Sequence, residues 1–177
     1  VKLSALPQTT ADFTPPSRPG PFTRSAGDLY RDWLFHGPRF QTVTRLLGLD
    51  EHGILAEILP TRPDEWRIGC WRNWLFDPGV VDSAPQMALI WTRAIWGKSA
   101  LPSRIGAVWR FGKGPLEPLS MHFQVRTESG GDHLKADIAF VSRADGRMRL
   151  QIEGLECTAS PALNRLGGGW RGEIRVP

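Results

Sequence analysis

The chain has 177 residues and a formal net charge of +4, with 41% hydrophobic and 23% charged residues. This length suits one domain that buries its own core without metals or disulfides as supports. No apolar stretch reaches the ~20 residues of a membrane span, and the first residues lack the apolar core of a signal peptide. The arginines are scattered, and no nucleic-acid-binding module is visible. We therefore expect a cytoplasmic protein with neither a membrane nor a nucleic acid as its partner.

The first part of the chain predicts a linker followed by two strands. Residues 1–27 form a proline-rich linker, because recurrent prolines exclude helix and interrupt strand pairing. A short amphipathic turn over 28–35 comes next. Residues 40–49 and 53–59 then alternate apolar and polar side chains, which is typical of two strands. The segment 49–53 between them, which ends in a glycine, predicts the hairpin turn.

The strongest helical pattern runs from residue 80 or 81 to Trp96 and ends at Gly97. Apolar side chains recur at helical spacing, and Arg93 is the only charge between Asp82 and Lys98. A helix that is apolar almost all round is buried. The preceding segment, 61–77, is rich in tryptophan and glycine, and we expect it to be a loop that covers part of the molecule.

Four further strands are predicted at 103–111, 119–125, 133–142 and 148–157, separated by glycine-containing turns. The order of two strands, one buried helix and four strands favours hairpins between consecutive strands in an antiparallel sheet. We therefore predict an α+β hotdog fold, a curved antiparallel sheet wrapped around one long central helix. The hotdog domain spans 28–160, and a glycine-rich tail occupies 161–177.

Asp82 is the first candidate for chemistry, because it lies near the start of the buried helix. Gln86 follows four residues later, on the same helical face, where its amide can orient the carboxyl group. Apolar neighbours disfavour a charged carboxylate, whereas the helix N-terminus favours it. An alternative interpretation is that Asp82 is only a helix-capping or first-turn acid.

His36 precedes Gly37 and Pro38, which force a turn before a strand. A lone histidine in a turn is more often a surface or structural residue than a catalytic one. The other histidines show no ligand-like spacing, so no metal site is predicted. Cys70 and Cys157 show no metal or redox spacing, and we expect them to be reduced.

Three stretches carry further motifs: YRDWLFHGPRFQ at 30–41, DPGVVDSAPQ at 77–86 and MRLQIEGLEC at 148–157. Together they resemble the second hotdog of polyketide synthase dehydratase domains. The stretch YRDWLFHGPRFQ at 30–41 is similar to that family's opening tyrosine and glycine-proline-x-phenylalanine-glutamine pattern. DPGVVDSAPQ at 77–86 resembles its His-Pro-x-x-x-Asp-x-x-x-Gln helix start, with Asp77 in place of the histidine. MRLQIEGLEC at 148–157 resembles its closing strand. The resemblance extends from about residue 28 to 157.

The resemblance implies a hydro-lyase that dehydrates a β-hydroxyacyl thioester carried on an acyl carrier protein. Asp82 would be the acid and Gln86 its orienting partner. His36 stands where many members have a tyrosine near the hydroxyl group. The base would be a histidine of a first hotdog, which this chain lacks. No cofactor is implied beyond the phosphopantetheine of the carrier.

The resemblance also implies where the substrate and partners bind. We expect Gly37, Pro38 and Phe40 at the site, and the acyl chain along the helix past Met87 and Trp91. Trp91 is equally well explained as a core residue. The partners are an acyl carrier protein and either a first hotdog half or a second copy in a dimer. The alternatives are a non-catalytic or isomerase-like hotdog that binds acyl-carrier thioesters, and a basic binding module unrelated to acyl groups.

Overall fold

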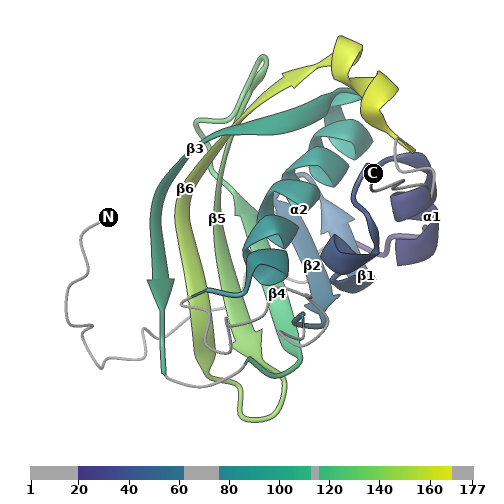
Figure 1. The fold of residues 1–177 in the computed structure, drawn as a ribbon. Helices are drawn as coiled ribbons and strands as arrows, with labels where there is room; N and C mark the ends of the chain where they lie inside the picture. Colours follow the sequence, from purple (N-terminus) through teal and green to yellow (C-terminus); the bar gives the residue numbers. More distant parts are fainter. Residues whose placement is uncertain (1–19, 62–75, 113–115, 169–177) are drawn as a thin grey trace, which may run out of the picture.

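The computed structural model describes residues 20–61, 76–112 and 116–168. Within these ranges two α-helices and two 3-10 helices accompany one six-stranded sheet (Figure 1). The helical elements are α1 (Ala26–Asp32), η1 (Pro38–Phe40), α2 (Pro78–Trp96) and η3 (Pro161–Leu166). The strands are β1 (Val43–Asp50), β2 (Gly53–Ile58), β3 (Ser99–Arg110), β4 (Leu119–Val125), β5 (His133–Ser142) and β6 (Met148–Ser160).

The sheet is antiparallel throughout, with the order β1-β2-β4-β5-β6-β3, and it curves around α2 (Figure 1). This confirms the predicted hotdog fold. The expected hairpin between the third and fourth strands is wrong, however. Because α2 carries the chain across the sheet, β3 reaches the far edge and pairs with β6, while β4 pairs with β2. The strand β3 therefore forms one edge of the sheet.

Helix α2 begins earlier than its apolar pattern predicts. Asp77 is the N-cap, and its Oδ1 accepts hydrogen bonds from the backbone N–H groups of Gly79 and Val80. Pro78 occupies the first helical position, where its missing N–H has no cost. The helix ends at Gly97, as predicted, in a left-handed conformation with φ 67°.

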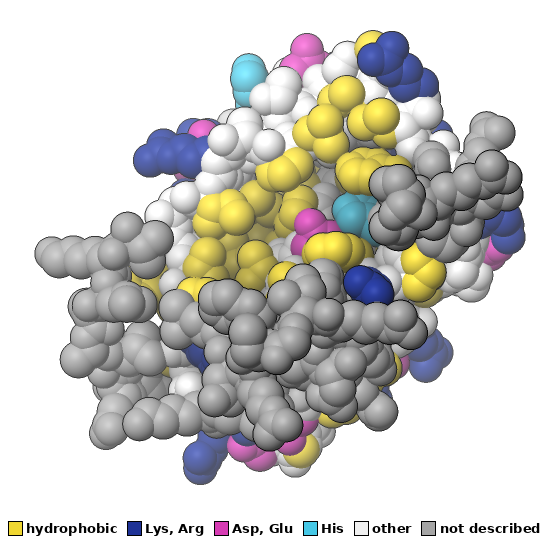
Figure 2. Space-filling model, viewed as in Figure 1, with side chains coloured by type: hydrophobic (Ala, Val, Ile, Leu, Met, Phe, Trp, Pro, Cys, Tyr) yellow, Lys and Arg dark blue, Asp and Glu magenta, His cyan; other side chains and the backbone are white. Residues whose placement is uncertain are grey.

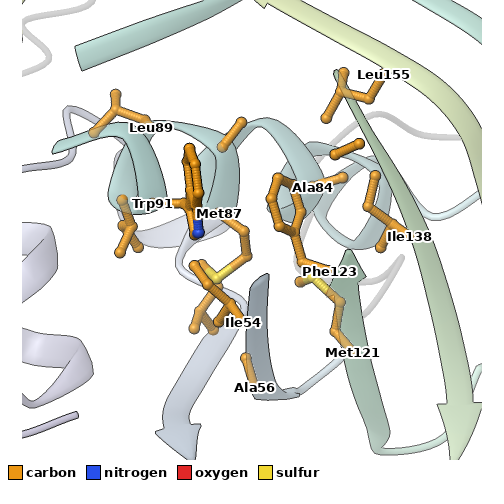
Figure 3. Packing of buried hydrophobic residues seen from close by; sticks show 14 of the residues in the cluster. Ile54, Ala56, Ala84, Met87, Leu89, Trp91, Met121, Phe123, Ile138 and Leu155 are labelled. Atoms are coloured by element: carbon orange, nitrogen blue, oxygen red, sulfur yellow. The ribbon is translucent and has the colours of Figure 1, made fainter. Parts of the chain in front are cut away.

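The core lies between α2 and the concave face of the sheet (Figure 3). Met87 and Ile90 of the helix are fully buried, as are Met121 and Phe123 of β4. Alternate residues of β4 are buried, so one face of this strand packs on the helix. Burial of these side chains stabilises the fold by roughly 1.5–3 kcal/mol for each large residue.

The predicted linker and tail both contribute ordered residues at their inner ends. Helix α1 begins at Ala26, and Phe22 packs against the core. At the other end, η3 follows β6 directly and is tied to α2 by a hydrogen bond from Asn164 Nδ2 to the carbonyl of Gly97. The outer parts of both segments lie outside the described residues, as does most of the predicted covering loop. No helix in the described ranges is long and apolar enough to cross a membrane.

Candidate active site

Asp82 lies in the second turn of α2, one turn beyond the N-cap. The capping interpretation of this residue is therefore wrong, because Asp77 holds the helix start. Gln86 Nε2 donates to Asp82 Oδ2 at 2.8 Å and to the carbonyl of Phe40 at 2.9 Å. The Asp82 side chain is 31% exposed, whereas Gln86 is fully buried. A buried amide thus holds a carboxyl group that remains accessible.

Tyr30 completes this network from α1. Its hydroxyl donates to Gln86 Oε1 at 2.8 Å and accepts from the backbone N–H of Val43 at 3.0 Å. Burial raises the pKa of Tyr30 well above its ordinary value, so the phenol stays a donor at neutral pH. Sequence reasoning assigned Tyr30 no role in the site. The available signal was its place in the 30–41 stretch as the only tyrosine of the chain.

His36 lies against Asp82. Its Nε2 is 3.3 Å from Asp82 Oδ2, and its ring stacks on Phe35 with centroids 4.4 Å apart. The His36 side chain is only 13% exposed, so the interpretation as a surface residue is wrong. Burial lowers the pKa of His36, and the Asp82 charge opposes that effect. Its Nδ1 is buried without a hydrogen-bond partner among the described residues.

The turn after His36 positions the next pocket residue. Gly37 is the N-cap of η1, Pro38 is its first residue, and the side-chain amide of Gln41 donates to the carbonyl of His36 at 3.0 Å. Phe40 of this short helix lines the pocket, and its carbonyl accepts the hydrogen bond from Gln86. Gly37 and Pro38 shape the turn but do not line the pocket in the described structure.

A pocket of about 520 Å³ opens beside Asp82, between the first half of α2 and the edge strand β3. Figure 2 shows a hollow of hydrophobic side chains with an acidic side chain and a histidine together at its margin. The side chain of Asp82 is the one polar member of the described lining. The other lining residues are Phe40, Phe76, Pro78, Val81, Pro85, Pro102, Ile105 and Val108.

Met87 and Trp91 lie elsewhere than expected. Both side chains are in the hydrophobic core, 0% and 3% exposed, and neither lines the described pocket (Figure 3). The indole N–H of Trp91 donates to the carbonyl of Asp50 at 2.7 Å, which anchors the helix to β1. The described pocket runs instead over the β3 side of α2.

The described residues offer little other chemistry. No three of their His, Cys, Asp and Glu side chains gather as a metal site. Cys157 is buried and free, and burial raises its pKa to about 12, so its thiol is a poor nucleophile. Cys70 lies outside the described residues. The arrangement of Asp82, His36 and Gln86 can instead transfer a proton to or from a ligand in an apolar pocket.

A family model described as the polyketide synthase dehydratase N-terminal domain matches residues 8–166. The dehydratase domain from the CurJ module of curacin polyketide synthase shares 18% identity with a TM-score of 0.57, over 78% of this chain and 48% of that one. The PpsC dehydratase domain of Mycobacterium tuberculosis, in complex with C12:1-CoA, shares 22% identity with a TM-score of 0.54, over 77% of this chain and 52% of that one.

An isomerase-inactive variant of GphF DH1 has a TM-score of 0.62 at 15% identity, over 88% of this chain and 54% of that one. At these identities the likeness shows the fold alone. The chain spans about half the length of these solved structures. No curated protein matches this chain.

Proposed function

Because this chain belongs to the polyketide synthase dehydratase family, we propose that it dehydrates a β-hydroxyacyl thioester with Asp82 as the acid. One observation carries the proposal: the Asp82 carboxyl, oriented by Gln86 and beside His36, is the one polar side chain of the described apolar pocket. Pockets that are mostly apolar, with a few placed polar groups, are typical of small-molecule sites.

The reaction balances as an elimination. A base removes the proton from C2 of the acyl group, and that C–H electron pair forms the C2=C3 double bond. The C3–O bond breaks, and the proton of the Asp82 carboxylic acid passes to the departing hydroxyl group, which leaves as water. The product is an α,β-unsaturated thioester. Proton transfer by each placed group contributes roughly 10²–10⁴-fold to the rate.

In this proposal the chain is the second hotdog of a double-hotdog dehydratase, and the base is a histidine of the other half. The edge position of β3 supports this, because an edge strand has unpaired backbone groups that a second sheet can pair. Ile105, at the pocket and on this strand, is 39% exposed. A second half against β3 would cover it and close the pocket.

The thioester would arrive on the phosphopantetheine of an acyl carrier protein. The net charge of +4 supports an acidic partner, since complementary charge speeds a transient encounter. The protein residues would then supply binding, orientation and proton transfer, with no further cofactor.

The test is the loss of water from a β-hydroxyacyl pantetheine thioester, followed by mass spectrometry. Imidazole is added as an external base in place of the partner histidine. We expect water loss that depends on imidazole, disappears in Asp82→Asn and persists in Glu128→Gln, which removes an exposed carboxylate from a turn. Undiminished water loss in Asp82→Asn, or none from the folded wild-type chain with imidazole present, contradicts the proposal.

A second candidate is the migration of a double bond in an enoyl thioester. It is favoured by the pairing of His36 and Asp82 within one chain, 3.3 Å apart. GphF DH1, whose variant is described as isomerase-inactive, is a structural neighbour. His36 would take a proton from C4, the electrons would shift toward the thioester carbonyl, and the proton would return at C2. Deuterium incorporation at C4 of an enoyl thioester in D2O, lost in His36→Gln, distinguishes this activity from dehydration, whose reversal exchanges hydrogen only at C2.

A further inference from the structure

We propose that the pocket beside Asp82 selects acyl groups whose chain beyond the hydroxyl-bearing carbon is hydrocarbon, without keto or hydroxyl substituents. This inference rests on the proposed function, because it assumes that the ligand is an acyl thioester. It adds the chemical class of the substrate, and it follows from the composition of the two pocket walls.

One wall comes from α2 and the other from β3. The helix presents Val81 and Pro85 around Asp82, and the strand presents Ile105 and Val108 opposite them. An oxygen on an acyl chain between these walls meets only hydrocarbon on the described side chains. Burial of a polar group without a hydrogen-bond partner is unfavourable, because its bonds to water are lost and not replaced.

The prolines of the lining strengthen this selection. Pro78, Pro85 and Pro102 have no backbone N–H, so neither their side chains nor their main chain can donate a hydrogen bond. A keto oxygen only accepts hydrogen bonds, so it has no partner at these positions.

Asp82 provides one polar position, which the reacting hydroxyl group occupies. The Oδ2 atom of Asp82 already accepts a hydrogen bond from Gln86 Nε2 and lies beside His36. The Oδ1 atom accepts no hydrogen bond from the described residues. A second oxygen farther along the chain would compete for this carboxyl or remain unpaired. The pocket therefore offers a hydrogen-bond partner to the reacting hydroxyl group and none to an oxygen farther along the acyl chain.

This selectivity indicates which reactions must precede the dehydration. The substrate must come from elongation steps in which each earlier β-carbonyl group had lost its oxygen, by reduction to a hydroxyl group and elimination of water. Chains that retain keto or hydroxyl groups from earlier steps are poor substrates. Each such oxygen should weaken binding about tenfold to hundredfold, as is typical when a hydrophobic site must accept an added polar group.

The experiment compares binding of two unreactive analogues, the decanoyl and 7-oxodecanoyl amides of pantetheine, by calorimetry. We expect the wild-type protein to bind the decanoyl amide about tenfold to hundredfold more tightly. Val108→Thr adds a hydroxyl donor to the pocket at constant shape and should narrow this preference several-fold. Val141→Thr is the matched control, because Val141 is a half-buried strand residue that does not line the pocket.

Equal affinity of the wild-type protein for the two amides overturns the inference, as does an equal effect of the two valine substitutions. The measurement needs no turnover, so its result is independent of dehydration. A clear preference for the decanoyl amide without water loss from hydroxyacyl thioesters rejects only the proposed function. Water loss without the preference rejects only the hydrocarbon selection.

Discussion

The hydroxyl of Tyr30 donates a 2.8 Å hydrogen bond to Oε1 of Gln86, across 56 residues of sequence. This bond settles the orientation of the amide. With its oxygen accepting from Tyr30, the amide NH2 faces Asp82 and the carbonyl of Phe40. Gln86 is therefore a donor to the Asp82 carboxyl, and Tyr30 and the Phe40 carbonyl together hold it in this orientation.

Tyr30→Phe should lower both stability and activity. Without the hydroxyl, the N–H of Val43 and Oε1 of Gln86 lose their partner in a buried region, which costs roughly 1–3 kcal/mol of unfolding free energy. We also expect kcat for dehydration to fall about tenfold, because the Phe40 carbonyl alone holds the amide less firmly in the orientation that donates to Asp82. Urea unfolding and the water-loss assay measure the two effects.

Thr44→Val is the control for this change. Thr44 also donates a hydroxyl hydrogen bond, to the carbonyl of Glu57, but at an exposed position. Its replacement should change the unfolding free energy by less than about 0.5 kcal/mol. If Tyr30→Phe is as harmless as Thr44→Val, then Tyr30 has no positioning role.

Gln86→Glu should destabilise the protein at neutral pH and recover on acidification. The new carboxylate would lie at a buried position where the amide N–H now donates to Asp82 Oδ2 and to the Phe40 carbonyl, and a carboxylate cannot donate to either. An uncompensated buried charge costs roughly 3–5 kcal/mol. The folded state then holds a proton more tightly than the unfolded chain, so stability rises as pH falls.

Unfolding by urea between about pH 5 and pH 8 measures this dependence. Gln86→Leu is the matched variant, since it loses the same hydrogen bonds but adds no charge. It should be destabilised without recovery at low pH. Parallel pH profiles for the two variants would contradict the prediction.

The titration of His36 should affect stability in the opposite sense. Burial lowers its pKa below the ordinary 6.5, so the unfolded chain binds this proton more tightly than the folded one. The stabilisation is complete above about pH 6.5 and is lost as pH falls through the folded-state pKa, with a slope of at most about 1.4 kcal/mol per pH unit. His36→Gln should remove this contribution to the dependence of the unfolding free energy on pH.

Imidazole NMR signals followed during a pH titration measure the His36 pKa directly. Burial also lowers the pKa of His122, so His122→Gln should remove a separate part of the same slope. A His36 signal that titrates at or above 6.5 would contradict the assigned burial effect.

Much of the fold could be predicted because its signals are local. The strands 119–125 and 133–142 were predicted with the bounds that β4 and β5 have, since alternation and glycine-containing turns mark both. The pairing of β3 with β6 was missed because it depends on the position at which the chain leaves α2 relative to the sheet. Local sequence patterns contain no information about this position. The helix start was placed too late, although Asp77 and Pro78 are typical of a cap and first position.

The site was predicted in part. Helical spacing correctly placed Gln86 beside Asp82. The same spacing could not tell core from pocket for Met87 and Trp91, because α2 is apolar on almost every face. Tyr30 was missed because its contact with Gln86 depends on how α1 packs against α2, a relationship between distant segments. The catalytic roles themselves remain predictions.

Gly79→Ala should destabilise the helix on which Asp82 lies, although alanine normally favours helices. A Cβ at Gly79 would clash with the methyl group of Thr61 and lie 2.7 Å from that of Thr42. Both threonines belong to the network that holds the helix start: Thr42 donates to the Gly79 carbonyl, and Thr61 donates to Asp77. We expect the clash to cost about 1–3 kcal/mol, as overpacking of a core does.

Gly27→Ala is the matched substitution, because Gly27 occupies the same second position of α1. Its Cβ would have Ser25 Oγ as its nearest neighbour at 3.8 Å, an ordinary contact. Here alanine has no clash to offset its higher helix propensity relative to glycine, so the substitution should stabilise the protein by up to about 1 kcal/mol. Thermal or urea unfolding of the two variants should therefore shift in opposite directions. A Gly79→Ala protein as stable as Gly27→Ala would mean that the helix start can move, and that Asp82 is not held in place by Asp77 and the two threonines.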